Sequence, residues 1–125
     1  MVQITSHDKA RRIASLAADK KGESIVLLEI KKLSPMCDWL VIVSSSSSRR
    51  IKAIASSIKE GMSKEGVRPL HIEGLDNPYW TLLDYGDVVV HIFFEDIREF
   101  YGLERLWSDA TLERFEEKCT EKTSQ

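Results

Sequence analysis

The sequence contains only two cysteines, Cys37 and Cys119, in a chain of 125 residues. Two thiols cannot form the disulfide framework of a small secreted domain, so a reducing compartment such as the cytoplasm is expected. No apolar run approaches the roughly 18 residues that span a bilayer. Residues 1–7 also lack the charged-then-apolar pattern of an export signal. We therefore expect a cytoplasmic protein without a membrane segment.

The short motifs of common enzymes are missing as well. There is no G-x-G-x-x-G, P-loop, H-E-x-x-H, C-x-x-C or G-x-S-x-G run. The three histidines, His7, His71 and His91, lie far apart and lack a spacing typical of metal ligands. No motif of a common enzyme class therefore marks the chain, and no metal site or cofactor is expected.

Each half of the chain is poor in one sign of charge. Residues 1–69 carry 13 Lys+Arg and 7 Asp+Glu, a balance of +6, whereas residues 70–125 carry 5 and 13, a balance of −8; together they give the net charge of −2. Phosphate contacts need Lys and Arg, so the acidic half is not expected to bind nucleic acid, and no sequence-specific nucleic-acid binding is expected. The acidic half would suit a basic partner, although a solvated surface is the simpler explanation.

The apolar pattern predicts an α/β protein with a mixed sheet of about five strands and flanking helices. Helices are predicted at residues 8–21, 51–66, 95–101, 103–107 and 111–119, and strands at residues 24–30, 39–44, 68–73, 80–84 and 88–94. The strand–helix–strand unit over residues 39–73 is expected to be a right-handed parallel crossover.

A run of five serines, Ser44–Ser48, precedes Arg49 and Arg50 between a predicted strand and a predicted helix. Hydroxyl groups, free backbone N–H groups and two guanidinium groups could hold a phosphate there. Without glycine the backbone cannot wrap closely around a phosphate. Capping of the helix by Ser47 or Ser48 is therefore the simpler interpretation.

Asp84 and Asp87 suggest a two-metal or acid–base site at first sight. Side chains alternate along a strand, so residues three apart point to opposite faces, whereas two carboxylates that serve one metal usually share a face. A single functional carboxylate stays open as an alternative. We expect both carboxylates to bond backbone groups of a turn in which Gly86 has a positive φ angle.

The predicted hairpin over residues 80–94 is largely apolar on both faces, so either helices cover both faces or one face meets a partner. Trp80, Leu82 and Asp84 share one face, and Trp80 is either an interface anchor or an ordinary core residue. Residues 93–107 add five aromatics and four acids. Of these acids, Glu95 and Glu104 are expected to point outward beside the hairpin, where carboxylates around an apolar anchor would suit a basic protein.

Four runs together resemble the ribosomal silencing factor (Iojap) family. They are CDWLVIV at residues 37–43, HIEG at 71–74, WTLLDYGDVVVH at 80–91 and REFYGLERLW at 98–107. The resemblance spans residues 10–109. We expect a silencing-factor domain over residues 1–109 and a polar, partly helical C-terminal tail over residues 110–125. Two runs depart from the family pattern: Ser44–Ser48 replaces a usual Ser-Gly-x-Ser, and Cys37-Asp38-Trp39 replaces Thr-Asp-Tyr.

The resemblance implies a non-enzymatic translation factor with a nucleotidyltransferase-like fold. Members of the family bind ribosomal protein number fourteen of the large ribosomal subunit, block joining of the small subunit and repress translation under nutrient limitation. Several members are dimers, so a homodimer is expected. The partner-binding residues are then expected to be Trp80, Leu82, Asp84, His91, Glu95 and Glu104.

Two other interpretations stay open. A nucleotidyltransferase-like enzyme or nucleotide-binding protein would use residues 44–50 together with Asp38 and Asp84. A dimeric interaction protein would use an exposed sheet face or edge for self-association. Nucleotide binding would identify the first class, and concentration-dependent sedimentation the second.

Overall fold

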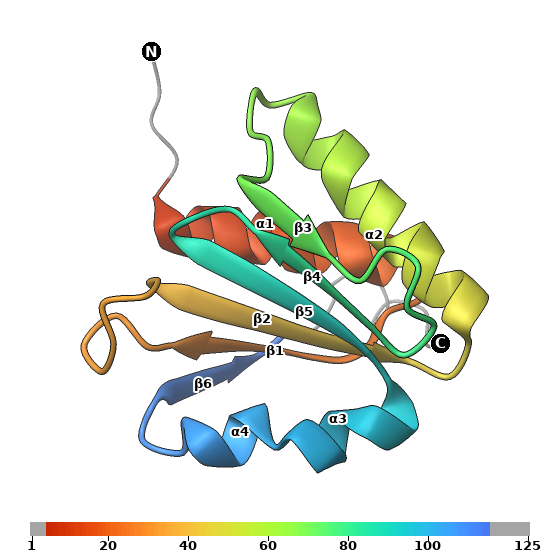
Figure 1. Ribbon diagram of the computed structural model, residues 1–125. Helices are drawn as coiled ribbons and strands as arrows, with labels where there is room; N and C mark the ends of the chain where they lie inside the picture. The colour runs from red at the N-terminus through yellow and green to blue at the C-terminus, as the bar shows by residue number, and fades with distance from the viewer. Residues whose placement is uncertain (1–4, 116–125) are drawn as a thin grey trace, which may run out of the picture.

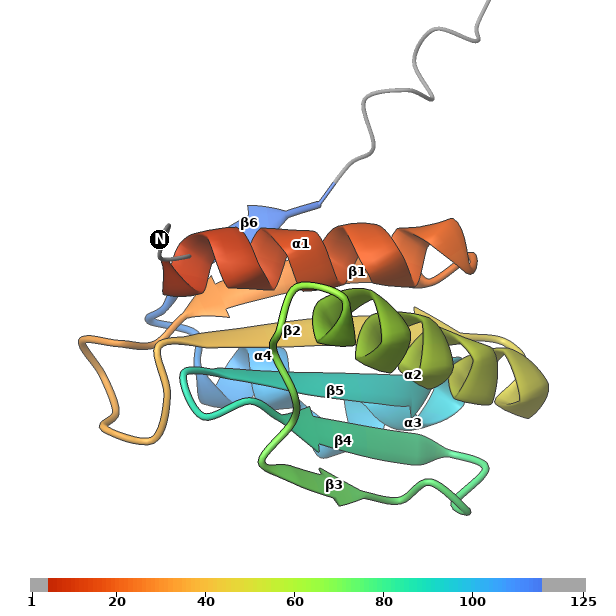
Figure 2. The same ribbon diagram turned by 90° about the horizontal axis from the view of Figure 1, so that it is seen from above.

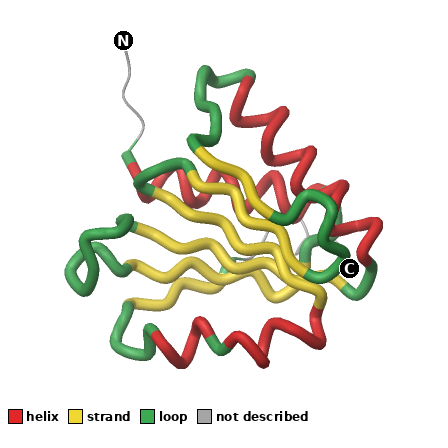
Figure 3. The backbone as a smooth tube through the Cα atoms, viewed as in Figure 1, coloured by secondary structure: helices red, strands yellow, loops and turns green. Residues whose placement is uncertain are grey.

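The computed structural model describes residues 5–115, with side chains left out at residues 99–101. Helices and strands are interspersed along the chain around one sheet (Figures 1 and 3). In order they are α1 (Ser6–Asp19), β1 (Glu23–Glu29), β2 (Trp39–Ser45), α2 (Ser48–Ser63), β3 (His71–Glu73), β4 (Trp80–Asp84), β5 (Val88–Phe94), α3 (Glu95–Tyr101), α4 (Leu103–Leu106) and β6 (Thr111–Arg114).

The sheet has six strands in the order β3-β4-β5-β2-β1-β6. Neighbouring strands are antiparallel except for the central pair, β2 and β5, which is parallel. The predicted α/β class with a mixed sheet is therefore confirmed.

Two pairs of helices cover the two faces of the sheet. Figure 2 shows α1 and α2 on one face, with α3 and α4 on the other. The central strand β2 is buried along its whole length, because its side chains alternate between the two layers. Val41 and Val43 pack into the cluster of α1 and α2, whereas Leu40 and Ile42 pack into a cluster that includes Ile97 of α3.

The predicted helix over residues 111–119 is wrong where the structure describes it. Thr111–Arg114 is a strand that pairs antiparallel with β1, from Val26 opposite Arg114 to Glu29 opposite Thr111. This pairing satisfies the backbone groups on the outer edge of β1, which local helix formation would leave open. The sheet therefore has six strands rather than about five, and residues 116–119 of the predicted helix lie outside the described residues.

The strand–helix–strand unit also differs in detail from the prediction. β3 is antiparallel to β4, and β4 to β5, so β3 runs parallel to β5 and β2. The parallel direction is as expected. β2 and β3 are not neighbours, however, because β5 and β4 are inserted between them.

Candidate functional site

The layer formed by α3 and α4 leaves part of its sheet face uncovered. These helices lie across β1, β2 and β5, and the β3–β4 side of the sheet extends beyond them (Figures 1 and 2). Five half-buried side chains of β4 and β5 form what we call the open sheet face. They are Trp80, Leu82, Asp84, Val89 and His91.

Strand register brings four of the six predicted site residues together on this face. Leu82 lies opposite His91, and Asp84 lies opposite Val89. Trp80 lies opposite Phe93, one position along the same face from His91. Directly opposite residues of an antiparallel pair project to the same side. Trp80, Leu82, Asp84 and His91 are therefore neighbours, as the alternation in the sequence predicts.

Trp80 is fixed by a side-chain contact across the strands. Its Nε1–H group donates to Nδ1 of His91 at 3.2 Å, and the two rings lie 6.2 Å apart. The His91 ring stacks in turn on Phe93 with a centroid distance of 5.7 Å. Burial lowers the pKa of His91 from 6.5 to about 4, so the ring is neutral at pH 7 and keeps the lone pair that Trp80 needs.

The turn between β4 and β5 follows the prediction for Asp84 but not for Asp87. Asp84 Oδ1 accepts a hydrogen bond of 2.8 Å from the Gly86 N–H group, and Gly86 has a φ angle of 90°. The side chain of Asp87 instead forms an ion pair of 2.8 Å with Lys9. The reason is that α1 packs over this end of the sheet and brings its first turn to Asp87.

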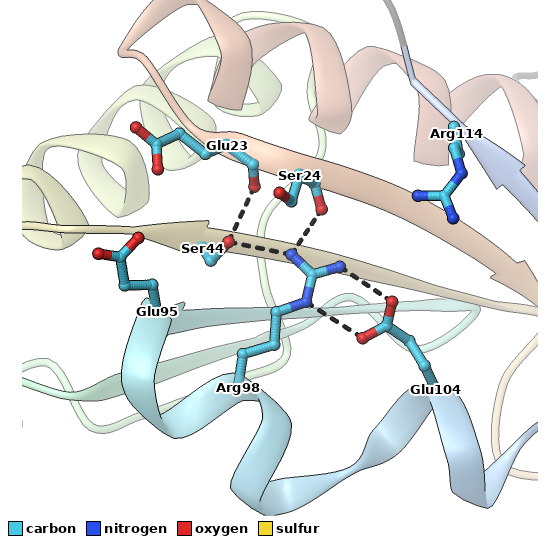
Figure 4. Close-up of a pocket in the computed structure, with 7 residues that line it drawn as sticks. All are labelled: Glu23, Ser24, Ser44, Glu95, Arg98, Glu104 and Arg114. Atoms are coloured by element: carbon cyan, nitrogen blue, oxygen red, sulfur yellow. Dashed lines mark hydrogen bonds and ion pairs between the residues drawn. The ribbon is translucent and has the colours of Figure 1, made fainter.

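Glu95 and Glu104 lie elsewhere. They line a polar pocket of about 350 Å³ over β1 and β2 (Figure 4). Arg98 fills its centre: it donates to both carboxylate oxygens of Glu104 at 3.1 and 3.2 Å, to Ser24 O at 2.5 Å and to Ser44 Oγ at 3.0 Å.

Glu104 was expected to point outward beside the hairpin, but it lies in this pocket instead, 37% exposed and paired with Arg98. Gly102 has a φ angle of 62° and ends α3, which turns α4 back and brings Glu104 to Arg98. Glu95 is exposed and forms no ion pair with another described residue.

The residues of the enzymatic interpretation do not converge. Asp38 and Asp84 lie at one end of the sheet, and burial together with these two carboxylates raises the pKa of the Cys37 thiol to about 11. The serine run begins at the opposite end of β2, about 20 Å away at 3.3 Å per residue. Ser47 caps α2 by accepting from Arg50 N–H at 3.2 Å, which confirms the capping interpretation.

Two further findings concern the described residues 5–115 as a whole. They contain no group of three or more His, Cys, Asp or Glu side chains arranged to hold a metal ion. None of their helices combines the length and the apolar character needed to cross a membrane.

Comparison with known proteins identifies the family. A family model described as "ribosomal silencing factor during starvation" matches residues 3–125. The chain is 40% identical over 102 residues to the ribosomal silencing factor RsfS of Bacillus subtilis, covering 81% of this chain and 86% of the relative. The chain belongs to the ribosomal silencing factor family. It is also 34% identical over 99 residues to the chloroplastic protein Iojap of Zea mays, covering 79% of this chain and 43% of that protein.

Solved structures of similar proteins share the fold of this silencing-factor chain. A crystal structure from Chromobacterium violaceum has a TM-score of 0.80 at 30% identity, covering 86% of this chain and 88% of its own. Another from Bacillus halodurans has a TM-score of 0.73 at 35% identity, covering 81% and 94%. The family model continues past Asp109, where the resemblance of sequence runs ended, and therefore includes β6.

Sequence reasoning missed three residues around the open sheet face of this silencing factor. Val89 lies on it, and the alternation along β5 carried enough information to place it there. Glu73 lies opposite Leu82, and His71 opposite Asp84, on the exposed strand β3. The HIEG run at residues 71–74 pointed to this stretch but not to its place beside the face, because the pairing of so short a strand depends on the whole sheet.

Proposed function

We propose that this ribosomal silencing factor represses translation by binding the large ribosomal subunit through ribosomal protein number fourteen. In this proposal the open sheet face is the contact surface, and the bound domain blocks the small subunit by occupying its volume. The observation that carries the proposal is a half-buried aromatic and aliphatic patch on β4 and β5, beside the layer of α3 and α4 and set in the acidic half of the chain.

Trp80 has the properties of an interface anchor. Its indole ring is half-buried and hydrogen-bonded to His91, so little side-chain entropy is lost when a partner covers it. Leu82 and Val89 extend the apolar surface. A tryptophan in such a position contributes much of the binding energy in protein interfaces.

The charge around the face suits a basic partner. The chain has no Lys or Arg between Arg68 and Arg98, and this stretch contains all of β3, β4 and β5. The same stretch contains Glu73, Asp76 and Asp84, and Glu95 follows at the start of α3. These carboxylates would accelerate the encounter with a positively charged protein and orient it. Glu104 would act indirectly, by holding Arg98 and so the position of α4.

The mechanism makes and breaks no covalent bond, so it needs no catalytic residue and no cofactor. A cytoplasmic domain of 14.3 kDa bound at the subunit interface is large enough to exclude the small subunit. The homodimer remains a separate prediction, and the exposed edge strand β3 is the natural place for it. Concentration-dependent sedimentation of the free protein would test it.

Co-sedimentation with isolated large subunits tests the proposal. We expect the wild-type protein to pellet with large subunits and to reduce the joined ribosomes that form when small subunits are added. Trp80→Ala should weaken binding by about 30-fold, equivalent to about 2 kcal/mol. Thermal unfolding of the free variant shows whether it is folded.

A charge substitution provides a matched comparison. Leu82→Lys places a positive charge on the open sheet face and should abolish binding to a basic partner. Leu106→Lys adds the same charge at an exposed position of α4, 68% accessible, and should bind like the wild type. Wild-type affinity in a folded Leu82→Lys protein would remove this face from the interface. Failure of the wild type to bind large subunits at any salt concentration would overturn the proposed function.

A further inference from the structure

The opposite side of the sheet carries a second surface, a groove along α2 that begins beside the C-terminal end of α1. Three adjoining hollows of about 480, 360 and 530 Å³ run along it. The first shares Lys20 and Ala53 with the second, and the second shares Glu60 and Lys64 with the third, so the three form one continuous depression. From Arg49 to Lys64 it follows α2 for about 22 Å, at 1.5 Å per residue.

Positive side chains dominate the lining of this basic groove. They are Lys20, Lys21, Arg49, Arg50, Lys59, Lys64 and Arg68. The acidic residues that line it are Asp19 and Glu60. None of the seven cations forms an ion pair with a described side chain. Mutual repulsion of such a cluster opposes folding, and a bound polyanion would relieve it.

The cations within α1 itself, unlike those along the groove, are paired. Lys9, Arg11 and Arg12 pair with Asp87, Glu113 and Glu65 respectively. Carboxylates therefore lie within reach of α1, but they pair with cations near the start of the helix and not with those along the groove. The cations along the groove are left available for a partner.

The floor of the groove indicates what kind of polyanion fits. It is built of small side chains, among them Ala53, Ser56, Gly61 and Ser63, and no aromatic residue lines any of the three hollows. Protein interfaces are depleted of lysine and serine and usually have an apolar or aromatic core. Lysine, arginine and hydroxyl groups instead make the phosphate and sugar contacts of nucleic-acid complexes. Without an aromatic ring, stacking on bases is not available.

We propose that the basic groove binds the sugar–phosphate backbone of double-stranded RNA without reading its base sequence. The choice of RNA over DNA rests on the proposed function, which places this protein on a particle built of RNA. The polyanion itself is inferred from the groove alone. Because α1 and α2 lie on the opposite face of the sheet from α3 and α4, RNA would not compete with a partner on the open sheet face.

Fluorescence anisotropy of the full chain with a labelled RNA duplex of about two helical turns tests this proposal. The double variant Lys20→Gln/Lys64→Gln should bind about tenfold more weakly at about 50 mM NaCl. The slope of the logarithm of the association constant against the logarithm of the salt concentration should become shallower by about 2. Each lost phosphate contact accounts for about 1.

The matched control is Lys31→Gln/Lys32→Gln. These exposed lysines lie in the loop between β1 and β2, whereas Lys20 and the start of α2 lie at the far end of β2. Both double variants remove two positive charges. The control should keep wild-type affinity and slope. Equal weakening in the control would mean that net charge, not the groove, determines binding, and would overturn the proposal.

Three other outcomes would also overturn it: no RNA binding by the wild type at low salt, tighter binding to a DNA duplex of the same sequence, or stronger displacement by polyglutamate than by unlabelled RNA. The last result would mean that an acidic protein occupies the groove. Trp80→Ala should leave RNA affinity unchanged. Loss of RNA binding by the groove variant therefore remains distinguishable from loss of large-subunit binding by the sheet-face variant.

Discussion

Single residues control the shape of the open sheet face through their neighbours. Trp80 keeps its orientation because His91 stays uncharged and offers Nδ1 as an acceptor. Protonation of His91 would replace this lone pair with a second N–H donor facing the indole N–H. A change at one buried ring nitrogen would therefore release the aromatic anchor.

Stability should fall as the pH falls through the titration range of His91. The pKa in the folded protein, about 4, is lower than the unfolded value of 6.5, so the unfolded state takes up the proton first. The contribution of His91 is complete above pH 6.5 and is lost between pH 6.5 and 4, by at most about 3 kcal/mol. Urea unfolding at pH 7.0 and at successive lower pH values measures the loss.

Two glutamine variants isolate this effect. In His91→Gln the amide oxygen can still accept from Trp80 but does not titrate, so stability should depend less on pH. His71→Gln changes an exposed histidine that pairs with Glu73, and should keep the wild-type pH dependence. If His91→Gln and the wild type lose the same stability on acidification, another group is responsible.

Gly74 supports the start of β4 by allowing a close backbone approach. Its φ angle is 79°, and a Cβ atom there would lie 2.4 Å from the carbonyl oxygen of Trp80. Gly66 has nearly the same φ angle, 81°, but a Cβ atom at that position would have nothing within 4 Å. Gly66→Ala should therefore cost about 1 kcal/mol from backbone strain alone. Gly74→Ala should cost at least about 1 kcal/mol more, because the Trp80 backbone must move.

Thermal or urea unfolding of the two alanine variants measures this difference. Large-subunit binding provides a second readout, since only Gly74→Ala displaces Trp80. If both variants lose the same free energy of unfolding, the start of β4 can move away from the new Cβ atom without a further loss of stability.

At the scale of elements, β6 determines how the sheet ends. Leu28 and its neighbours in β1 pair with β2 on one side and β6 on the other, so β1 is an internal strand. Glu113 of β6 also accepts from His7 at 2.8 Å and pairs with Arg11, which connects the strand to α1. Loss of β6 would expose the edge of β1, with its apolar side chains, to other molecules.

Two truncations test the contribution of β6. A chain that ends at Asp109 should be less stable, by about 2 kcal/mol or more, than a chain that ends at Phe115, because it lacks the backbone hydrogen bonds of this strand. It should also associate at lower protein concentration. Urea unfolding and light scattering would measure the two effects. Equal stability of the two chains would mean that β6 adds nothing to the sheet.

The elements with clear periodicity were the predictable ones. Ile51, Ile54 and Ile58 recur at helical spacing and lie buried in α2, and the alternation from Trp80 to His91 placed four residues on one face. β6 carries no such signal: it has four residues, and its leucine is 42% exposed on an edge. The place of Glu104 depended on how α4 turns after Gly102, which sequence spacing does not determine.

The whole molecule separates its charges between the two faces of the sheet. The seven cations of the basic groove lie on the side of α1 and α2, and they come from the half of the chain with a balance of +6. The acidic half supplies β3, β4, β5, α3 and α4. Under the two proposals above, this arrangement would give each face its own class of partner, a polyanion on one side and a basic protein on the other.

A comparison of two lysine sets distinguishes cations that stabilise the fold from cations available for binding. Lys9 is largely buried and paired with Asp87, so Lys9→Gln should lower stability by about 1 kcal/mol at any salt concentration. Lys20→Gln/Lys64→Gln removes unpaired charges, so it should change stability by less than about 0.5 kcal/mol. At low salt the change should be a gain, because repulsion within the groove decreases, and added salt should remove it. Urea unfolding at two salt concentrations measures these changes. A clear loss of unfolding free energy in the double variant would mean that the groove lysines stabilise the fold itself.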